Sequence, residues 1–138
     1  MPAKALVVPD LSLVVGRAWD VLTADDLAAA TTATRRDPRF HPHFRQLADF
    51  RAVTDYDFGG STVRRLATVD VYAPGTRRAF VVASDESFGL ARMFQMLREA
   101  PNDGLRVYRD FREAVTWLDL TGVEARVLAI LGGIGPAA

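Results

Sequence analysis

The sequence contains no cysteine, which excludes disulfides, thiolate metal sites and cysteine nucleophiles. It has no excess of one charge, because 17 basic residues balance 17 acidic ones, so no net field attracts nucleic acid or an anionic membrane. Long hydrophobic runs are also missing, since the C-terminal run 127–134 is too short to span a bilayer. We therefore expect a soluble cytoplasmic protein without a signal peptide, a membrane span or a nucleic-acid partner.

What the chain does contain is an alternation of strand and helix patterns. Its 138 residues, 49% of them apolar, suffice for one core. The predicted strands cover residues 5–8, 11–18, 44–50, 78–83 and 105–108. Capping patterns and apolar stripes predict helices at 23–36, 61–72, 85–99, 110–118 and 121–132. This order predicts an α/β fold with a mixed, mainly parallel sheet of five strands, which opens with a hairpin and carries four or five helices.

The turn at the start of the predicted second helix is the most informative segment for function. Its two glycines and two hydroxyl residues can surround an anion, because the first backbone N–H groups of a helix lack partners and carry the positive end of the macrodipole. The candidate residues for this weak anion or ligand site are Asp57, Gly59, Gly60, Ser61, Thr62, Arg64 and Arg65. The alternative, which we favour, is helix capping by Ser61 or Thr62.

Other polar residues give no complete catalytic or metal site. His41 and His43 are the only histidines, and their proline-rich loop offers no full ligand set. Asp49, Asp55 and Asp57 can gather at the carboxyl end of a central strand, where open sheets often bind ligands. No serine stands in a nucleophile turn. We therefore predict no enzyme activity, no metal and no cofactor.

Two apolar surfaces are candidates for contacts with a partner. Phe88 and Met96 lie on or beside the outer stripe of the predicted third helix. A second apolar face lies on the tail helix, where it either covers its own sheet, as we favour, or docks on another subunit. Together these weak partner-surface candidates are Phe88, Met96, Val127, Ile130 and Leu131. They lead us to expect a homodimer.

Two side chains carry expectations about packing. Leu97 shares an apolar stripe with Phe94 in the third helix, so we expect it in the core. Trp117 lies at the edge of the apolar stripe of the fourth helix, and its large ring predicts a side chain that is at least half buried.

The order of the elements and several short segments resemble a known family. From 13 to 118 the order is hairpin, helix, strand, helix, strand, helix, strand and helix. The segments that carry the resemblance are 47–55 with its acidic turn, Asp-Pro-Arg-Phe at 37–40, Thr-Asp at 54–55 and Phe-Gly-Leu-Ala-Arg-Met at 88–93. The chain resembles a STAS domain, the fold of bacterial anti-sigma-factor antagonists, and in particular the SpoIIAA-like branch of uncharacterised bacterial proteins.

The resemblance implies a STAS-like domain over 1–120 with a C-terminal helical extension at 121–138. It implies a non-enzymatic interaction or ligand-sensing module in bacterial regulation. In signalling STAS domains an Asp-Ser-Ser/Thr-Gly/Ala turn supplies the serine that a partner kinase phosphorylates, whereas here Asp57 is followed by Phe58, Gly59 and Gly60. We therefore predict that the protein is not a serine-kinase switch of the ordinary kind.

The alternative function is a carrier of a lipid or another apolar small molecule. SpoIIAA-like chains are often grouped with CRAL-TRIO-type folds, and the apolar residues of the tail and the third helix can line a cavity. A cavity between the sheet and the tail helix favours the carrier, whereas a flat apolar patch favours the interaction module. The expected ligand is a small anionic or apolar molecule.

Overall fold

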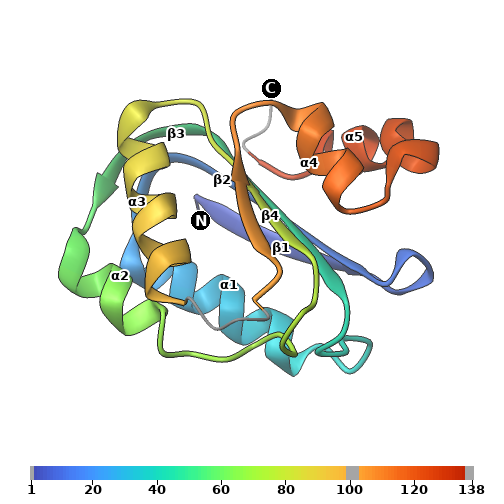
Figure 1. Cartoon of the computed structure of the whole chain (residues 1–138), viewed down its shortest axis with the longest axis horizontal. Coiled ribbons are helices and arrows are strands. Elements are labelled where there is room, and N and C mark those ends of the chain that lie inside the picture. Colours follow the sequence, from blue (N-terminus) through green and yellow to red (C-terminus); the bar gives the residue numbers. More distant parts are fainter. Residues whose placement is uncertain (1, 99–102, 136–138) are drawn as a thin grey trace.

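The computed structural model describes residues 2–98 and 103–135, which form a sheet between two layers of helices (Figure 1). The strands are β1 (Ala3–Val8), β2 (Leu13–Thr23), β3 (Arg45–Asp57), β4 (Arg78–Val81) and β5 (Leu105–Tyr108). The described α-helices are α1 (Ala24–Arg36), α2 (Gly60–Leu66), α3 (Asp85–Leu97), α4 (Phe111–Trp117) and α5 (Glu124–Gly132). The predicted α/β class is confirmed. None of the described helices is long and apolar enough to cross a membrane.

The sheet has the strand order β1-β2-β3-β4-β5, with β1 antiparallel to β2 and the other neighbours parallel. The predicted hairpin is therefore present. Each parallel connection steps in the same direction across a helix, and because such crossovers are right-handed, α1, α2 and α3 lie on one face. Helices α4 and α5 follow the last strand and cover the other face (Figure 1).

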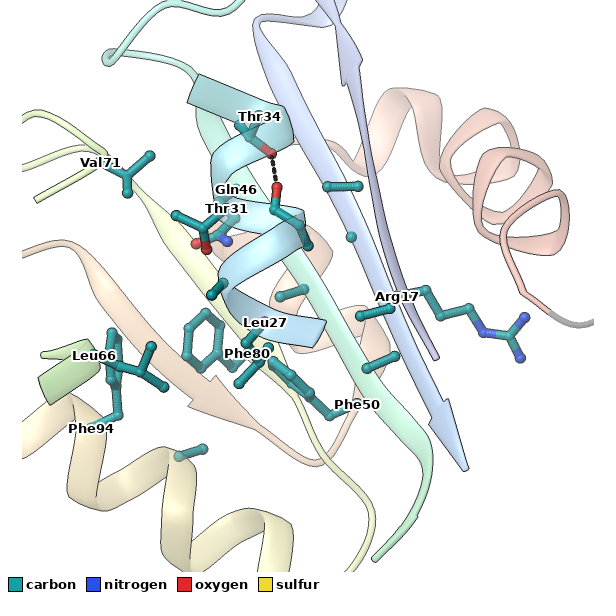
Figure 2. Close-up of a pocket in the computed structure, with 18 of the residues that line it drawn as sticks. Arg17, Leu27, Thr31, Thr34, Gln46, Phe50, Leu66, Val71, Phe80 and Phe94 are labelled. Atoms are coloured by element: carbon teal, nitrogen blue, oxygen red, sulfur yellow. Dashed lines mark hydrogen bonds between the residues drawn. The ribbon is translucent and has the colours of Figure 1, made fainter. Parts of the chain in front are cut away.

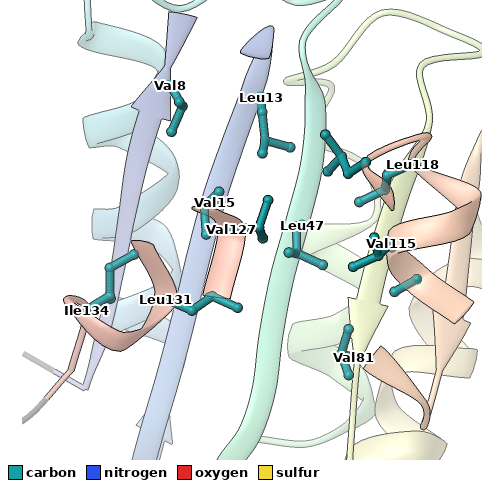
Figure 3. Close-up of a cluster of buried hydrophobic side chains, with 13 residues drawn as sticks. Val8, Leu13, Val15, Leu47, Val81, Val115, Leu118, Val127, Leu131 and Ile134 are labelled. Atoms are coloured by element: carbon teal, nitrogen blue, oxygen red, sulfur yellow. The ribbon is translucent and has the colours of Figure 1, made fainter. Parts of the chain in front are cut away.

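The tail helix packs on the sheet of its own chain. Val127 and Leu131 are buried among side chains of β2 and β3, such as Val15 and Leu47 (Figure 3). This is the alternative that the sequence favoured, because an apolar helix face beside an apolar sheet face is buried most simply within one chain. The two residues are therefore unavailable to a partner, and naming them as partner surface was wrong. Ile130 is partly buried at the margin of the same core.

Strand β3 is longer than predicted. It continues past Phe50 to Asp57, because β2 also continues to Thr23 and pairs with it in parallel beyond the end of β4. The predicted acidic loop is therefore the end of a two-stranded arm, and it is the partner strand rather than the local sequence that keeps it extended.

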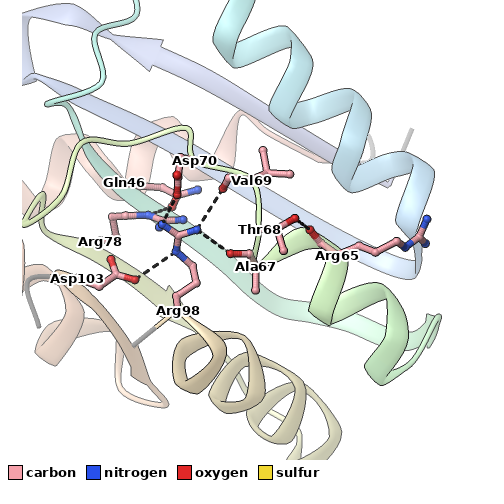
Figure 4. A network of polar contacts seen from close by, with 9 residues as sticks. All are labelled: Gln46, Arg65, Ala67, Thr68, Val69, Asp70, Arg78, Arg98 and Asp103. Carbon is pink, nitrogen blue, oxygen red and sulfur yellow. Dashed lines mark hydrogen bonds and ion pairs between the residues drawn. The ribbon is translucent and has the colours of Figure 1, made fainter. Parts of the chain in front are cut away.

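Helix α2 is shorter than predicted and ends at Leu66 instead of residue 72. The guanidinium of Arg98, from the end of α3, donates to the carbonyl oxygens of Ala67 (3.1 Å) and Val69 (3.2 Å) (Figure 4). Carbonyls at the end of a helix have no partner within it. A side chain from a distant element therefore stabilises the chain where it leaves the helix.

The inner face of helix α3 differs in part from the predicted stripe, because Phe94 packs against the core as predicted whereas Leu97 does not. Ser87 and Ala91 are buried, and Gln95 donates to the carbonyl of Leu105 (2.9 Å), whereas Leu97 is 46% exposed. Polar side chains lie on the inner face because each finds a partner there, Ser87 with the hydroxyl of Tyr56. The prediction that Leu97 belongs to the core was wrong.

Trp117 is more than half buried, as predicted. Its indole N–H lies 3.2 Å from the carbonyl of Arg78 and 3.1 Å from that of Gly104. The guanidinium groups of Arg77 and Arg106 lie 4.5 Å and 4.2 Å from the centre of its rings. The side chain thus ties α4 to the start of β4 and β5.

Candidate functional site

The glycine and hydroxyl turn of α2 serves packing. The helix begins after Gly59 with no side-chain cap, so the prediction that Ser61 or Thr62 caps it was wrong. Both hydroxyls lie inside the first turn, beyond the position from which a cap accepts its bond. A Cβ on Gly60 would lie 3.1 Å from the methyl carbon of Met93, so the glycine lets α2 approach α3 closely.

The remaining predicted anion-site residues form no enclosed site. Arg64 and Arg65 are exposed on a helix of only seven residues, and Asp57 is exposed at the end of β3. Arg65 donates to the hydroxyl of Thr62, which is buried (3.3 Å). Anion binding at this turn stays a prediction, as does the absence of a serine-kinase switch.

Capping can be tested with two matched substitutions. We expect Ser84→Ala to lower the free energy of unfolding by about 1 kcal/mol, because the Ser84 hydroxyl accepts the backbone N–H of Ser87 (3.0 Å) at the start of α3. Ser61→Ala should change it by only a few tenths of a kcal/mol, since this exposed side chain caps nothing. Urea unfolding measures both, and a larger loss for Ser61→Ala would contradict the assignment.

The predicted polar candidates lie apart in the structure. His41 and His43 are exposed, with ring centres 5.2 Å apart. Asp49 is buried and binds the arginine two residues later, because it lies within β3 rather than at the end of the strand. Asp55 and Asp57 are exposed. Within residues 2–98 and 103–135, no three metal-ligating side chains come together.

A cavity of about 360 Å³ lies on the face of the sheet that carries α1, α2 and α3 (Figure 2). Helix α1 forms one wall, α2 and α3 form the other, and the sheet forms the floor. The cavity predicted for a carrier lies on the opposite face, between the sheet and the tail helix. That space is filled by the core shown in Figure 3.

The cavity exists because two facing layers carry small side chains. Gly16 and Ala48 are neighbours across β2 and β3 in the floor, and Phe80 follows in the same row on β4. Above the floor, α1 contributes Ala30 and Thr31 to the lining. Small residues on both sides leave a gap that a well-packed interior would fill. Its volume is in the range of pockets that bind small molecules.

The walls are mainly apolar. Phe80 packs edge-on against Phe50, with ring centres 5.3 Å apart, and it lies 5.6 Å from Phe94 on α3. Figure 2 shows Phe80 and Phe50 close to Leu27 of α1, and Phe94 beside Leu66 of α2. The apolar part of a ligand that enters this space displaces water from apolar protein surface, which stabilises the complex.

A polar group lies at one end of the cavity floor. Gln46 and Arg78 are cross-strand neighbours, and the Nε of Arg78 donates to the Oε1 of Gln46 (2.8 Å). The ring centre of Tyr72 lies 4.7 Å from the guanidinium, and all three residues line the cavity. Burial lowers the pKa of Arg78 to about 10. Burial raises the pKa of Tyr72, so both groups keep their protons at neutral pH and can donate.

Gln46 and Arg78 were not among the predicted site residues. A pattern was nevertheless present, because each begins an alternating run on the inner face of a strand, Gln46 before Ala48 and Arg78 before Phe80. A polar residue at the start of two such runs indicates a polar end to a buried face. What the pattern does not give is the pairing of the two strands.

A second arginine lies near Arg78 and is fully paired. Arg98 binds Asp70 (3.1 Å) and Asp103 (3.2 Å) as well as two backbone carbonyls (Figure 4). Its charge weakens proton binding at Arg78, and Asp103 acts in the opposite direction. Asp70 and Asp103 are therefore both paired with Arg98.

The molecule is a three-layer α/β protein with a mostly parallel sheet between helices. Among solved structures, it is similar to an uncharacterized protein from the DUF3478 family with a SpoIIAA-like fold, from Shewanella loihica PV-4. The two chains are 16% identical, with a TM-score of 0.49, over 84% of this chain and 91% of that chain. The likeness concerns the fold alone. No protein-family model and no curated protein matches the sequence.

The predicted homodimer stays a prediction. Of the predicted partner-surface residues, Met96 is 58% exposed. Phe88 is partly buried, and the guanidinium of Arg109 lies 4.7 Å from its ring centre. Exposed apolar side chains remain near the end of α3, where Leu97 follows Met96.

Proposed function

We propose that the protein binds a small apolar molecule in the cavity between the sheet and helices α1, α2 and α3. In this role it is a ligand-sensing module or a carrier, and it performs no chemistry on the ligand. The observation that carries the proposal is the cavity of about 360 Å³ with its aromatic walls. It has room for about a dozen water-sized groups, taking roughly 30 Å³ for each.

The position of the cavity supports a sensing or carrying role. Helices α2 and α3 pack against each other, whereas α1 packs on β1 and β2, so the two walls belong to separate packing units. A ligand that touches Leu27 of α1 and Phe94 of α3 joins these units. Binding would then stabilise the fold by mass action.

A substitution that fills the cavity tests the proposal. We expect Ala30→Phe to weaken binding of the neutral fluorescent dye N-phenylnaphthylamine at least about tenfold, because the added ring takes up part of the space. Ala29→Phe is the matched control, since Ala29 is the adjacent residue of α1, is exposed and does not line the cavity. Dye titration measures affinity, and circular dichroism checks that both variants are folded.

Native mass spectrometry of freshly purified protein adds an independent readout. A mass retained by the wild type and by Ala29→Phe, and absent from Ala30→Phe, identifies a ligand held in the cavity. Equal dye affinity of the wild type and folded Ala30→Phe would show that the dye binds elsewhere, and the proposal would then be wrong.

A further inference from the structure

Arg78 is the buried cation of the cavity. Four cationic residues line it, Lys4, Arg17, Arg35 and Arg78, and of these only Arg78 is buried, with 7% of its surface exposed. Figure 2 shows the guanidinium of Arg17 pointing away from the cavity. An ionised group in such a place is costly unless it is paired.

Within the described residues, Arg78 has no carboxylate partner. Its guanidinium makes one hydrogen bond there, from Nε to Gln46, and the nearby Asp70 and Asp103 pair with Arg98 instead. No side-chain nitrogen or oxygen of the described chain is both fully buried and without a hydrogen bond. The two terminal Nη groups of Arg78 make no hydrogen bond to a described residue, and the side chain lines the cavity.

A second donor lies beside this guanidinium. Tyr72 is 8% exposed and also lines the cavity, and its hydroxyl makes no hydrogen bond to another described residue. The Tyr72 ring packs on the guanidinium of Arg78, and Gln46 holds the Nε edge. Among the described residues, the two Nη groups of Arg78 and the Tyr72 hydroxyl are therefore donors without an acceptor beside the cavity.

We propose that the cavity selects an apolar carboxylic acid, whose carboxylate pairs with the Nη groups of Arg78. This inference rests on the proposed function. The planar guanidinium matches the two oxygens of a carboxylate, and pairing there compensates the buried charge. Arg78 and Phe80 lie two residues apart on one face of β4, about 7 Å, so the head and the apolar body of such an acid fit next to each other.

The test compares decanoate with 1-decanol, which has the same chain length and no charge. Displacement of N-phenylnaphthylamine at neutral pH gives both affinities. We expect the wild type to bind decanoate at least about tenfold more tightly than 1-decanol, as a charge-assisted pair at a buried site requires. Arg78→Met should bind both equally, and Arg78→Lys should keep part of the preference.

Arg77→Met is the matched control. Arg77 is adjacent in sequence, but it is exposed and packs on Trp117 at the opposite face, so the preference for decanoate should be unchanged. Ala30→Phe should weaken decanoate binding, which places the acid in the cavity.

The outcomes separate the two proposals. If the wild type binds decanoate and 1-decanol with equal affinity, and Ala30→Phe binds neither, the proposed recognition of a carboxylate is wrong. The proposal that the cavity binds apolar molecules would then still hold. A preference for decanoate that survives in Arg78→Met would also overturn it. Failure of the wild type to bind the dye, 1-decanol or decanoate would overturn both. The wild-type comparison decides the matter even if Arg78→Met fails to fold.

Discussion

Replacing Val127 by aspartate is expected to lower the free energy of unfolding by about 4 kcal/mol or more, enough to unfold much of the protein. Val127 has no exposed surface and lies among Val15 and Leu47 of the sheet (Figure 3). A carboxylate there would lose its hydration and find only apolar neighbours.

The adjacent Leu128 provides the control for this variant. It lies on the same helix and is 48% exposed, so Leu128→Asp should change stability by no more than about 0.5 kcal/mol. Urea unfolding followed by tryptophan fluorescence and circular dichroism measures both. Equal, small effects of the two substitutions would mean that α5 does not pack on the sheet of its own chain.

The second large effect is expected to be stabilising. Without ligand, Arg78→Met should raise the free energy of unfolding by about 2 kcal/mol at neutral pH. Burial lowers the pKa of Arg78 from 12.5 to about 10, which corresponds to roughly 3 kcal/mol of unfavourable burial of the charge. Loss of the hydrogen bond to Gln46 offsets about 1 kcal/mol of this gain. Methionine fills similar space without a charge.

The difference in stability between Arg78→Met and the wild type should change with pH in a definite direction. Below about pH 10 both the folded and the unfolded wild type hold the Arg78 proton, so the full cost of burial is present. Between about pH 10 and 12.5 the folded state releases the proton first, and the contribution of Arg78 to stability rises. The advantage of Arg78→Met should therefore be constant from pH 7 to 9 and shrink above pH 10.

The titration of Tyr72 lowers the stability of the folded state over the same range of pH. Burial raises its pKa, so its contribution is complete below its ordinary pKa of 10.0 and is lost as the pH rises further. It is present in both proteins, and comparing them removes most of its effect. Urea unfolding at several pH values makes the measurement, and a loss of stability above 1 kcal/mol in Arg78→Met would contradict the assignment of an unpaired buried charge.

The two predictions for Arg78 are linked. Arg78 is expected to lower stability when the cavity is empty and to bind the ligand when the cavity is occupied. Such a conflict between stability and function is common at binding sites. Above its dissociation constant, decanoate should stabilise the wild type by an amount that grows with the logarithm of its concentration, and it should stabilise Arg78→Met less.

The sequence by itself determined the features that depend on near neighbours. Thr23 caps α1 in a capping box with Asp26, and Ser84 and Asp110 cap α3 and α4, which agrees with the capping patterns at the start of the helices predicted at 23–36, 85–99 and 110–118. These hydrogen bonds join residues two or three apart, so the local sequence contains all that they need. The alternation of strands and helices likewise gave the class of fold and the opening hairpin, because apolar periodicity is a local property.

The tertiary structure decided what depends on contacts between distant elements. The end of β3 depends on its pairing with β2, and the end of α2 depends on Arg98. The cavity arises where Gly16 and Ala48 of the sheet meet Ala30 of α1, three residues that look unremarkable in the sequence. Arg77 and Arg78 are the same residue type, so the sequence does not distinguish them. Because side chains alternate between the two faces of a sheet, Arg77 points toward solvent and Arg78 points into the cavity.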